Sequence, residues 1–397
     1  MNSDSLFKSI TFGQTYFKTK IMSDFIVSAR KYRPDTFKSV VGQSAITETL
    51  SNSISSQKLA HAYLFCGPRG VGKTTCARIF AKTINCTNIK DNEACNECES
   101  CLSFNKGTSM NIHEMDAASN NSVEDIRLLI DQVRISPQMG EYSVYIIDEV
   151  HMLSSQAFNA FLKTLEEPPT HAIFIMATTE KHKILPTILS RCQIFDFNRI
   201  QVADISKQLE FVAKSEKIET EEEALHVIAN KADGGMRDAL SIFDQITSFS
   251  GGKVTYASVI ENLNVLDYDY FFKLSTALFN AKISDAFLTL EEILNKGFEG
   301  SQVLTGLSKH FRDILVSVDA NTIQLLELSE SIKAKYQSES KIIGAKYIYD
   351  ALDIINQYEL SFKGSQNKRL HVELCFVKLA NINAEHEKFE LLKKKLG

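Results

Sequence analysis

The sequence predicts a mixed fold, with an α/β domain around a parallel sheet in the first half of the chain and only helices in the second half. All six prolines lie at or before Pro186, and the rest of the chain has helical patterns throughout. The first half contains short apolar runs of the kind that is buried on both faces of a parallel sheet. Strands are expected at 63–66, 112–115, 143–150, 172–179 and 194–197.

The composition is that of a folded protein and restricts the functional classes. The 397 residues are enough for about two to four domains, and 44% apolar residues provide for packed cores. The formal net charge of −5 is unlike that of a strongly basic DNA-binding protein, so any contact with DNA would use a local patch. No apolar run reaches about eighteen residues and no secretory signal is present, so we expect a cytoplasmic protein without a membrane segment.

The segments before the first strand have different patterns. Residues 1–21 show no clear period and are expected to form a leader, although translation could also start at Met22. Residues 28–43 form an arm, and a helix is expected to follow at 44–56. The arm either packs on the core or covers a bound base. The candidate base contacts are Tyr32, Val40 and Val41.

The segment 61–75 has the pattern of a phosphate-binding loop between a strand and a helix. It contains G-x-x-x-x-G-K-T, and the alternative is a glycine-rich turn without a ligand. Glycines allow N–H groups to point at phosphate oxygens, and the helix N-terminus adds positive potential. We expect Lys73 to reach the β- and γ-phosphates of ATP and Thr74 to hold Mg²⁺. The expected nucleotide-binding residues of this loop are Gly67, Pro68, Arg69, Gly70, Val71, Gly72, Lys73, Thr74 and Thr75.

Four of the eight cysteines are grouped in the segment 86–101, with the spacing C-x8-C-x2-C-x2-C. Thiolates two residues apart can grip one tetrahedral ion from a tight turn, and the residues between them are polar rather than core-like. We expect a closed structural metal site without a catalytic role, in preference to reduced surface thiols or a redox pair. The expected ligands are Cys86, Cys95, Cys98 and Cys101.

Two helices of the first half have clear N-terminal signals. Ser122 and Asp125 have the spacing of a capping box, and the helix that follows has an apolar face. Ser154 is expected to cap the next helix, which Pro168 and Pro169 end.

The third strand ends in two acids. The carboxyl end of a strand is where an α/β sheet binds its ligands, so Asp148 is placed to support the Mg²⁺ ion. Glu149 follows it and can act on the attacking water.

Several stretches together resemble the gamma/tau subunits of bacterial DNA polymerase III, which are AAA+ ATPase subunits of clamp loaders. The resemblance covers residues 22–380. It rests on Arg-Lys-Tyr-Arg-Pro…Phe…Val-Val-Gly-Gln in the arm, on His-Ala-Tyr-Leu-Phe with the phosphate loop, and on Asn-Ala-Phe-Leu-Lys-Thr-Leu-Glu-Glu-Pro-Pro at 159–169.

The resemblance implies roles for further residues. Thr179 lies where the family has a sensor of the γ-phosphate, with its neighbour Thr178 as an alternative. Arg191, in Ser-Arg-Cys, would project into the ATP site of the next subunit, unless it only closes a salt bridge. Arg237, in Gly-Gly-Met-Arg, would be a second sensor carried by the lid domain, with a solvated arginine as the alternative. The four grouped cysteines would bind structural Zn²⁺.

The resemblance also implies three domains and a tail. We expect an AAA+ P-loop NTPase domain with a parallel sheet at 22–200, a helical lid at 201–265, a C-terminal helical collar at 266–390 and a tail at 391–397. The collar helices are expected at about 267–280, 282–296, 301–317, 322–338, 342–361 and 367–389.

The implied partners are those of a replication motor. They are the other clamp-loader subunits, copies of the chain itself in a ring, the sliding clamp, primer–template DNA and the polymerase core, all at the cytoplasmic nucleoid. Nucleotidyl transfer by the DNA-directed DNA polymerase would belong to other subunits.

Two other hypotheses fit part of the sequence. A nucleotide-binding scaffold without turnover would be expected to lack Lys73 or Glu149, and both are present. A different AAA+ machine, such as a junction helicase, would need a pore or hairpin loop in place of the cysteine insertion.

Overall fold

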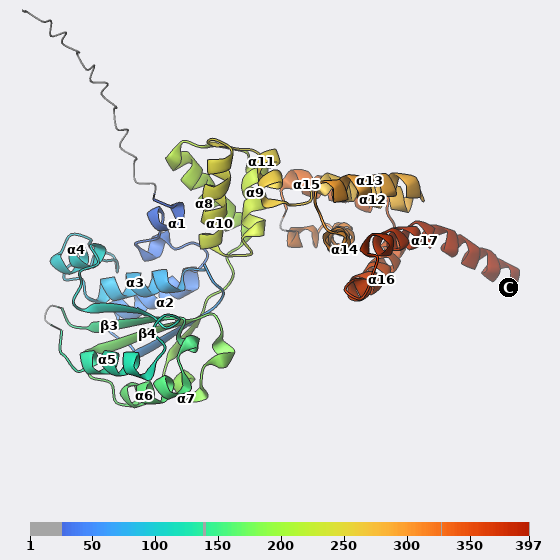
Figure 1. The fold of residues 1–397 in the computed structure, drawn as a ribbon. Helices are drawn as coiled ribbons and strands as arrows, with labels where there is room; N and C mark the ends of the chain where they lie inside the picture. Colours follow the sequence, from blue (N-terminus) through green and yellow to red (C-terminus); the bar gives the residue numbers. More distant parts are fainter. Residues whose placement is uncertain (1–25, 138–139, 327, 397) are drawn as a thin grey trace, which may run out of the picture.

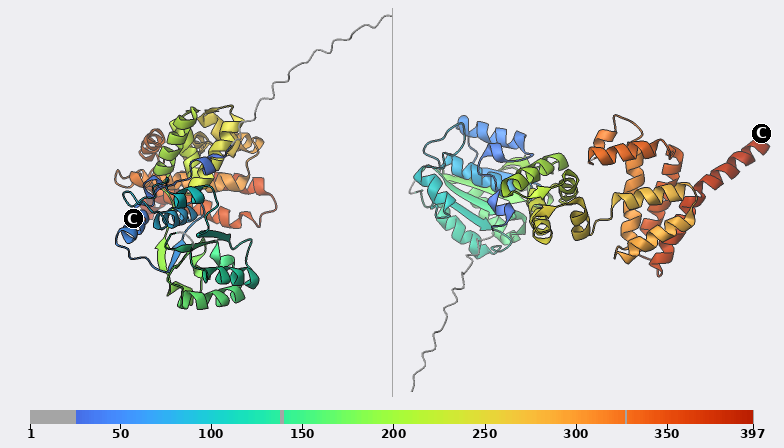
Figure 2. Two further views of the ribbon diagram at one scale, coloured as in Figure 1. Left: turned by 90° about the vertical axis from the view of Figure 1, so that its left-hand side faces the viewer. Right: turned by 90° about the horizontal axis from the view of Figure 1, so that it is seen from above.

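The computed structural model describes residues 26–137, 140–326 and 328–396, with side chains as far as residue 384. The leader expected at 1–21 lies outside the described residues, as do the side chains of the tail expected at 391–397. The described chain forms an α/β domain, a small helical domain beside it and a second helical domain further along (Figures 1 and 2). The predicted combination of one parallel-sheet domain with two helical domains is confirmed.

The α/β domain is built on a five-stranded parallel sheet with the order β2-β3-β4-β1-β5. All residues of β1 and β4 are buried, and so are all but the last of β3, which explains their almost continuous apolar sequences. The five predicted strands are confirmed to within two residues at each end. They are β1 (Ala62–Cys66), β2 (Ile112–Asp116), β3 (Ser143–Asp148), β4 (Ala172–Thr178) and β5 (Gln193–Asp196).

Helices cover both faces of this sheet, and each face has its own hydrophobic core (Figure 1). α2 (Ser44–Ser55) and α3 (Lys73–Ile84) lie on one face. The opposite face is covered by α5 (Val123–Val133), α6 (Ser155–Glu166) and α7 (Pro186–Leu189). Short elements outside these layers are α1 (Ser28–Lys31), the 3₁₀ turn η1 (Phe37–Ser39) and α4 (Glu99–Asn105).

The expected capping box at the start of α5 is confirmed. Ser122 Oγ accepts a hydrogen bond of 3.2 Å from the Asp125 N–H, and Asp125 Oδ2 accepts one of 3.1 Å from the Ser122 N–H. The cap of α6 is confirmed as well, since the Ala157 N–H donates to Ser154 Oγ at 3.2 Å. Local hydrogen bonds therefore fix where these two helices begin.

The small helical domain packs around one apolar core. Its two-residue strands β6 (Glu219–Thr220) and β7 (Lys253–Val254) pair in parallel and were not predicted, because two residues are too few to show a period. The helices are α8 (Val202–Glu216), α9 (Glu222–Lys231), α10 (Met236–Phe249) and α11 (Tyr256–Leu263).

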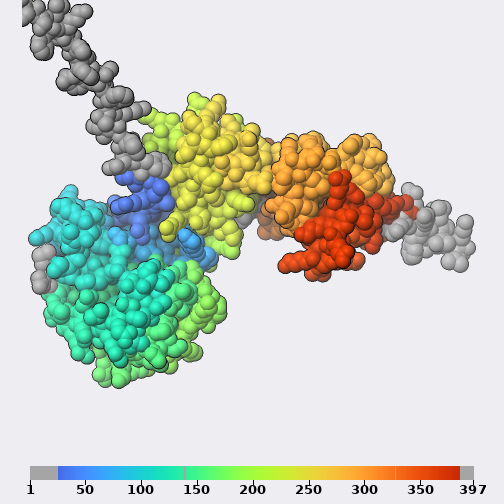
Figure 3. Space-filling view, in the orientation of Figure 1, coloured from blue at the N-terminus to red at the C-terminus, as the bar shows by residue number. Residues whose placement is uncertain are grey.

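The N-terminal arm lies where the α/β domain meets the small helical domain, and its surface is coloured dark blue in Figure 3. At its start, the Ser28 N–H donates a 2.7 Å hydrogen bond to Asp244 Oδ2 of α10. Further along, Phe37 is buried in the core of the α/β domain. The arm therefore contacts both domains.

The last domain is all helical, and one of its predicted helices was wrong. The segment expected to be helical at 322–338 begins with the 3₁₀ turn η4 (Ile323–Leu325), and its α-helix starts only at Glu330. Leu326 and Leu328 are both buried, and residues two apart cannot lie on one face of a helix. The helices are α12 (Tyr268–Phe279), α13 (Ile283–Asn295), α14 (Gly300–Val316), α15 (Glu330–Ser340), α16 (Ala345–Phe362) and α17 (Lys368–Leu396).

A helix that crosses a lipid bilayer needs about twenty predominantly apolar residues. Within the described residues, no helix combines this length with this apolar character.

The capping box gives a stability test. Replacing Ser122 with alanine removes the acceptor of the Asp125 N–H and should lower the free energy of unfolding by about 1 kcal/mol, measured by urea unfolding. Ser55→Ala is the matched control, because this exposed hydroxyl only bonds a carbonyl of its own helix α2. A loss for Ser122→Ala no larger than that for Ser55→Ala would contradict the role of the cap.

Candidate nucleotide-binding site and cysteine cluster

The loop between β1 and α3 has a backbone that requires glycine. A Cβ at Gly67 would clash with the carbonyl oxygen of Phe197, so no larger residue fits there. Left-handed φ values also favour glycine at the two later positions of the loop. The three φ angles are 148° at Gly67, 78° at Gly70 and 105° at Gly72.

Lys73 lies inside this loop, with only 6% of its surface exposed. Its Nζ donates hydrogen bonds of 2.7 Å to the carbonyl oxygens of Gly67 and Pro68. Burial lowers the pKa of Lys73, while the nearby carboxylates of Glu149 and Asp148 act in the opposite direction. The ammonium group is therefore held against the loop backbone, near Asp148 at the end of β3 and Glu149 directly after it.

Asp148 joins the end of β3 to the start of α3. Its Oδ2 accepts a 2.6 Å hydrogen bond from Thr74 Oγ1, and its Oδ1 accepts one of 3.0 Å from the Glu149 N–H. Mg²⁺ is bound in proteins by carboxylate oxygens, and in phosphate-binding loops also by the Ser or Thr hydroxyl. The sequence-predicted Mg²⁺ ligands are thus brought into direct contact.

Glu149 leaves the strand with a left-handed backbone, at φ 47°. Its Oε2 accepts hydrogen bonds from Thr179, at 3.0 Å from Oγ1 and 3.3 Å from the N–H. Left-handed conformations of residues other than glycine cost free energy and are frequent at functional sites. The conformation directs this carboxylate toward the end of β4.

The two threonines at the end of β4, Thr178 and Thr179, have different surroundings. Thr178 is fully buried, and its Oγ1 accepts from the Glu180 N–H and lies 3.0 Å from His151 Nδ1. Thr179, in contrast, bonds Glu149 directly. Of the two sensor candidates, it is therefore Thr179 whose hydroxyl donates a hydrogen bond to the Glu149 carboxylate.

The small helical domain reaches the phosphate loop through the start of α10. A Cβ added at Gly70 would lie 3.2 Å from Gly235 Cα and 3.5 Å from Arg237 Cβ. Arg237 is the second residue of α10, so the predicted second sensor stands directly against the loop.

The arm places the three predicted base contacts in two environments. Val40 faces the loop, because a Cβ at Gly72 would lie 3.9 Å from Val40 Cγ1. Tyr32 and Val41 instead pack against the core of the small helical domain, and the Tyr32 hydroxyl donates to Glu216. Of these three residues, the structure brings only Val40 next to the phosphate loop.

Arg33 also contacts the site and was missed in the sequence. Its Nε donates a 3.2 Å hydrogen bond to Thr75 Oγ1, at the start of α3. The available signal was the Arg33-Pro34 pair, since a residue before proline is held in an extended conformation. The Arg33-Pro34 pair restricts the backbone conformation of Arg33 but does not indicate where its side chain points.

Arg191 lies apart from these residues. Its guanidinium forms a 2.8 Å ion pair with Glu166 and donates at 2.7 Å to the carbonyl of Thr187. These contacts come from α6 and α7, on the sheet face opposite α3 (Figure 1). Within one chain, Arg191 is therefore not part of the site formed around the phosphate loop.

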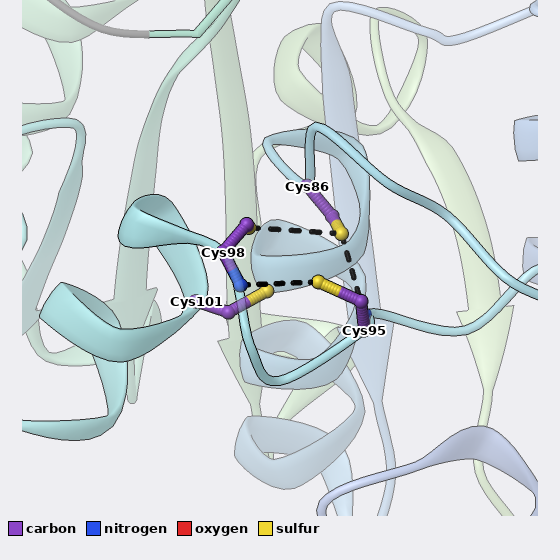
Figure 4. Close-up of side chains that lie close together, drawn as sticks. All are labelled: Cys86, Cys95, Cys98 and Cys101. Carbon is purple, nitrogen blue, oxygen red and sulfur yellow. Dashed lines mark hydrogen bonds between the residues drawn. The ribbon is translucent and has the colours of Figure 1, made fainter.

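The four grouped cysteines converge on one point (Figure 4). Their sulfur atoms all lie within 4.8 Å of one another, and Cys86 Sγ and Cys98 Sγ are 4.0 Å apart. Tetrahedral Zn²⁺ with Zn–S bonds of about 2.3 Å would separate its thiolates by about 3.8 Å. The four sulfurs therefore fit such an ion after small adjustments.

Backbone N–H groups around the cluster favour thiolate. The N–H groups of Glu97 and Cys98 point at Cys95 Sγ, at 3.4 and 3.3 Å, and lower the pKa of this thiol. Thiolate is the form that binds metal. Burial acts in the opposite direction and raises the pKa of Cys86 and Cys101 in the same cluster. It also raises the pKa of the cysteines outside the cluster, to about 11 for Cys66 and to about 12 for Cys76, Cys192 and Cys375.

Comparison with known families gives matches to two parts of the chain. Residues 42–201 match the family described as DNA polymerase III, delta subunit. Residues 204–252 match the family described as DNA polymerase III clamp loader subunit, ATPase lid domain.

Curated relatives match nearly the whole chain. The DNA polymerase III subunit tau of Bacillus subtilis (strain 168) is 42% identical over 371 residues, which cover 92% of this chain and 66% of that protein. The DNA polymerase III subunit gamma of Buchnera aphidicola subsp. Acyrthosiphon pisum (strain APS) is 34% identical over 359 residues, which cover 90% of this chain and 99% of that protein. The chain thus spans slightly less than two thirds of the first relative and nearly all of the second.

Among solved structures, the Thermotoga maritima RuvB Holliday junction branch migration motor is similar to part of the chain. It is 20% identical, the alignment covers 62% of this chain and 79% of that one, and the TM-score is 0.44. A score this low supports no argument about this chain.

Proposed function

Because the chain belongs to the DNA polymerase III gamma/tau family, as its match to almost the full length of a gamma subunit shows, we propose that it is the ATP-hydrolysing motor of a bacterial clamp loader. ATP binding and hydrolysis would drive the loading of a sliding clamp on primed DNA during replication. The observation that carries this proposal is the meeting of Lys73, Thr74, Asp148, Glu149 and Thr179 at one edge of the sheet.

In this proposal the phosphate loop and the end of β3 bind ATP with its metal ion. The loop N–H groups and Lys73 would hold the phosphates, once Nζ exchanges the carbonyls of Gly67 and Pro68 for phosphate oxygens. Thr74 and Asp148 would hold Mg²⁺, which would supply positive charge to the phosphates.

Glu149 is proposed to orient and deprotonate the attacking water. Its Oε2 is engaged by Thr179, so the carboxylate is not free in the described arrangement. A γ-phosphate that takes over the Thr179 hydroxyl would release the carboxylate for the water. Hydrolysis would then start only when the triphosphate is in place.

Arg191 is proposed to act in the site of a neighbouring subunit. Its partner Glu166 has 49% of its side-chain surface exposed, and an exposed ion pair contributes only about 0–1 kcal/mol. The guanidinium can therefore leave Glu166 at low cost and stabilise the charge on a neighbour's γ-phosphate. This role explains why it lies far from its own phosphate loop.

The helical parts are proposed to couple this chemistry to assembly. Arg237 would link the position of the lid domain to the nucleotide, because α10 begins against the loop. The last domain would form the collar that holds the subunits of the loader, and copies of this chain, in a ring. Nucleotidyl transfer is not proposed for this chain; it would belong to a polymerase core that joins the assembly in the cytoplasm.

The cysteine cluster is proposed to hold one structural Zn²⁺ ion. Four thiolates close the coordination sphere and leave no position for a substrate, so the ion would have no catalytic role.

The motor proposal predicts turnover that depends on DNA and clamp. In an assembly with the other clamp-loader subunits, primed DNA and sliding clamp should stimulate ATP hydrolysis. Lys73→Ala should abolish nucleotide binding, whereas Glu149→Gln should retain it and lower kcat by about 10²–10⁴. Turnover that is independent of DNA, or ATP binding without turnover, would support another motor or a scaffold instead.

The role of Arg191 across the subunit interface predicts complementation. Arg191→Ala should lower kcat by about 10³ or more, while Arg134→Ala, a control at an exposed arginine of the same domain, should not. Mixing Arg191→Ala chains with Lys73→Ala chains should restore part of the activity, because some interfaces then combine an intact loop with an intact arginine. Activity of Arg191→Ala equal to that of the wild type would exclude this role.

The metal proposal predicts one zinc ion per purified chain by elemental analysis. Cys98→Ser should lose most of the ion and lower the melting temperature. Cys192→Ser, at a partly buried cysteine outside the cluster, should keep it. Equal zinc contents in both variants would contradict the assignment.

A further inference from the structure

The cysteine cluster closes the base of a tight hairpin. At the tip, Lys90 and Glu93 exchange backbone N–H···O hydrogen bonds of 3.1 and 2.9 Å, and the two residues between them have φ of 50° and 62°. Two successive left-handed residues are typical of a type I′ turn, which fixes the geometry of a hairpin. At the base, the Cys95 N–H donates to Cys86 Sγ at 3.3 Å. Glu93 therefore has a backbone position set from both ends.

The hairpin is also anchored to the phosphate-binding helix. Cys86 follows directly on Asn85, the C-cap of α3. Lys82, near the end of α3, is 3% exposed and donates a 2.7 Å hydrogen bond to Asn96 Oδ1, between two of the cysteines. The cluster and α3 are thus joined at two points and form one unit.

The side chain of Glu93 connects this unit to the N-terminal arm. Its Oε2 accepts from the Phe37 N–H and its Oε1 from the Lys38 N–H, both at 3.1 Å. These N–H groups begin η1 and have no partner within the turn. Because both carboxylate oxygens bind successive N–H groups, the hairpin fixes the position and orientation of the arm.

The arm contacts the phosphate loop on both sides of η1. Before η1, Arg33 donates to Thr75 Oγ1 at 3.2 Å. After it, Val40 packs beside Gly72. Between these contacts, Phe37 is 5% exposed and inserts into the core that α2 and α3 share. A displacement of η1 would therefore move Arg33 and Val40, two arm residues that contact α3 and the phosphate loop.

We propose that Glu93 is a positioning residue for nucleotide binding, through which the metal-stabilised hairpin holds the arm against the phosphate loop. The inference rests on the proposed ATP and zinc sites and gives the zinc ion a task beyond local stability. Loss of the ion would loosen the base of the hairpin and release Glu93 from its contacts with η1. The contact between the arm and the phosphate loop would then weaken, although none of the four cysteines is proposed to contact the nucleotide.

The test compares Glu93→Ala with Glu97→Ala in the full-length chain. Glu97 lies two residues beyond the base of the hairpin, and its exposed side chain forms a long 3.6 Å ion pair with Lys90. Glu93→Ala should weaken the Kd for a fluorescent ATP analogue with Mg²⁺ by about tenfold, the size expected from losing hydrogen bonds to a charged acceptor. Glu97→Ala should leave it unchanged, and Glu93→Gln, which keeps one acceptor oxygen, should be intermediate. At saturating ATP, kcat should change by less than about twofold, since Glu93 touches no reacting atom.

Metal removal then tests the connection. Chelation of zinc from the wild type should weaken the Kd to the value of Glu93→Ala and should speed tryptic cleavage after Lys38, whereas chelation of Glu93→Ala should have little further effect on either. Zinc content, measured for all variants, should stay at one ion per chain before chelation.

Three results would overturn the inference. They are wild-type affinity in both Glu93 variants, additive losses from Glu93→Ala and chelation, and slow cleavage after Lys38 in Glu93→Ala. A wild type that binds the analogue but contains no zinc would remove the metal from the proposal, leaving the Glu93 variants to test the contact with the arm. A wild type that does not bind the analogue would overturn the motor function itself.

Discussion

The 2.6 Å hydrogen bond between Thr74 and Asp148 is the contact on which the arrangement of the site depends. It joins the first turn of α3 to the end of β3, although β4 lies between β1 and β3 in the sheet. Such a bond is possible because parallel strands end at the same edge, where a buried strand gives way to polar residues. The register Cys66↔Thr178 aligns the ends of β1 and β4 in the same way and brings Thr179 to Glu149. Asp148 and Thr179 are thus placed by strands whose residues before the carboxyl edge are mostly apolar and buried.

This dependence explains why much of the site could be predicted from the sequence. A strand buried on both faces has a continuous apolar pattern, and its first polar residue marks the carboxyl edge. Asp148 could therefore be located from the apolar pattern alone, whereas the choice of Thr179 over its neighbour Thr178 came from the family resemblance. The cysteine spacing was equally informative, because a shared ion requires sulfurs that meet, as these do. The apolar run and the cysteine spacing each lie within a short stretch of sequence, and each restricts the local conformation of the backbone.

Contacts of the arm could not be predicted in this way. The side chain of Arg33 reaches a partner 42 residues away in the sequence, and that of Glu93 reaches partners 55 and 56 residues away. Neither residue lies in a periodic segment. The same limit applies to Tyr32, whose aromatic ring was as compatible with a base as with the small helical domain on which it packs. The helix expected at 322–338 was misplaced for a related reason. Burial of Leu326 and Leu328 overrides helix propensity, and burial is set by the neighbouring helices.

The position of Arg191 has a consequence for how activity scales with assembly. Its ion pair with Glu166 lies on the sheet face opposite the phosphate-binding helix. If Arg191 acts across an interface as proposed, each chain contributes its arginine to one ATP site and its phosphate loop to another. An open arc of identical chains then completes one centre fewer than it has members, whereas a closed ring completes them all. The ATPase activity per chain would therefore increase when the ring closes. A single chain in dilute solution would bind its nucleotide without hydrolysing it.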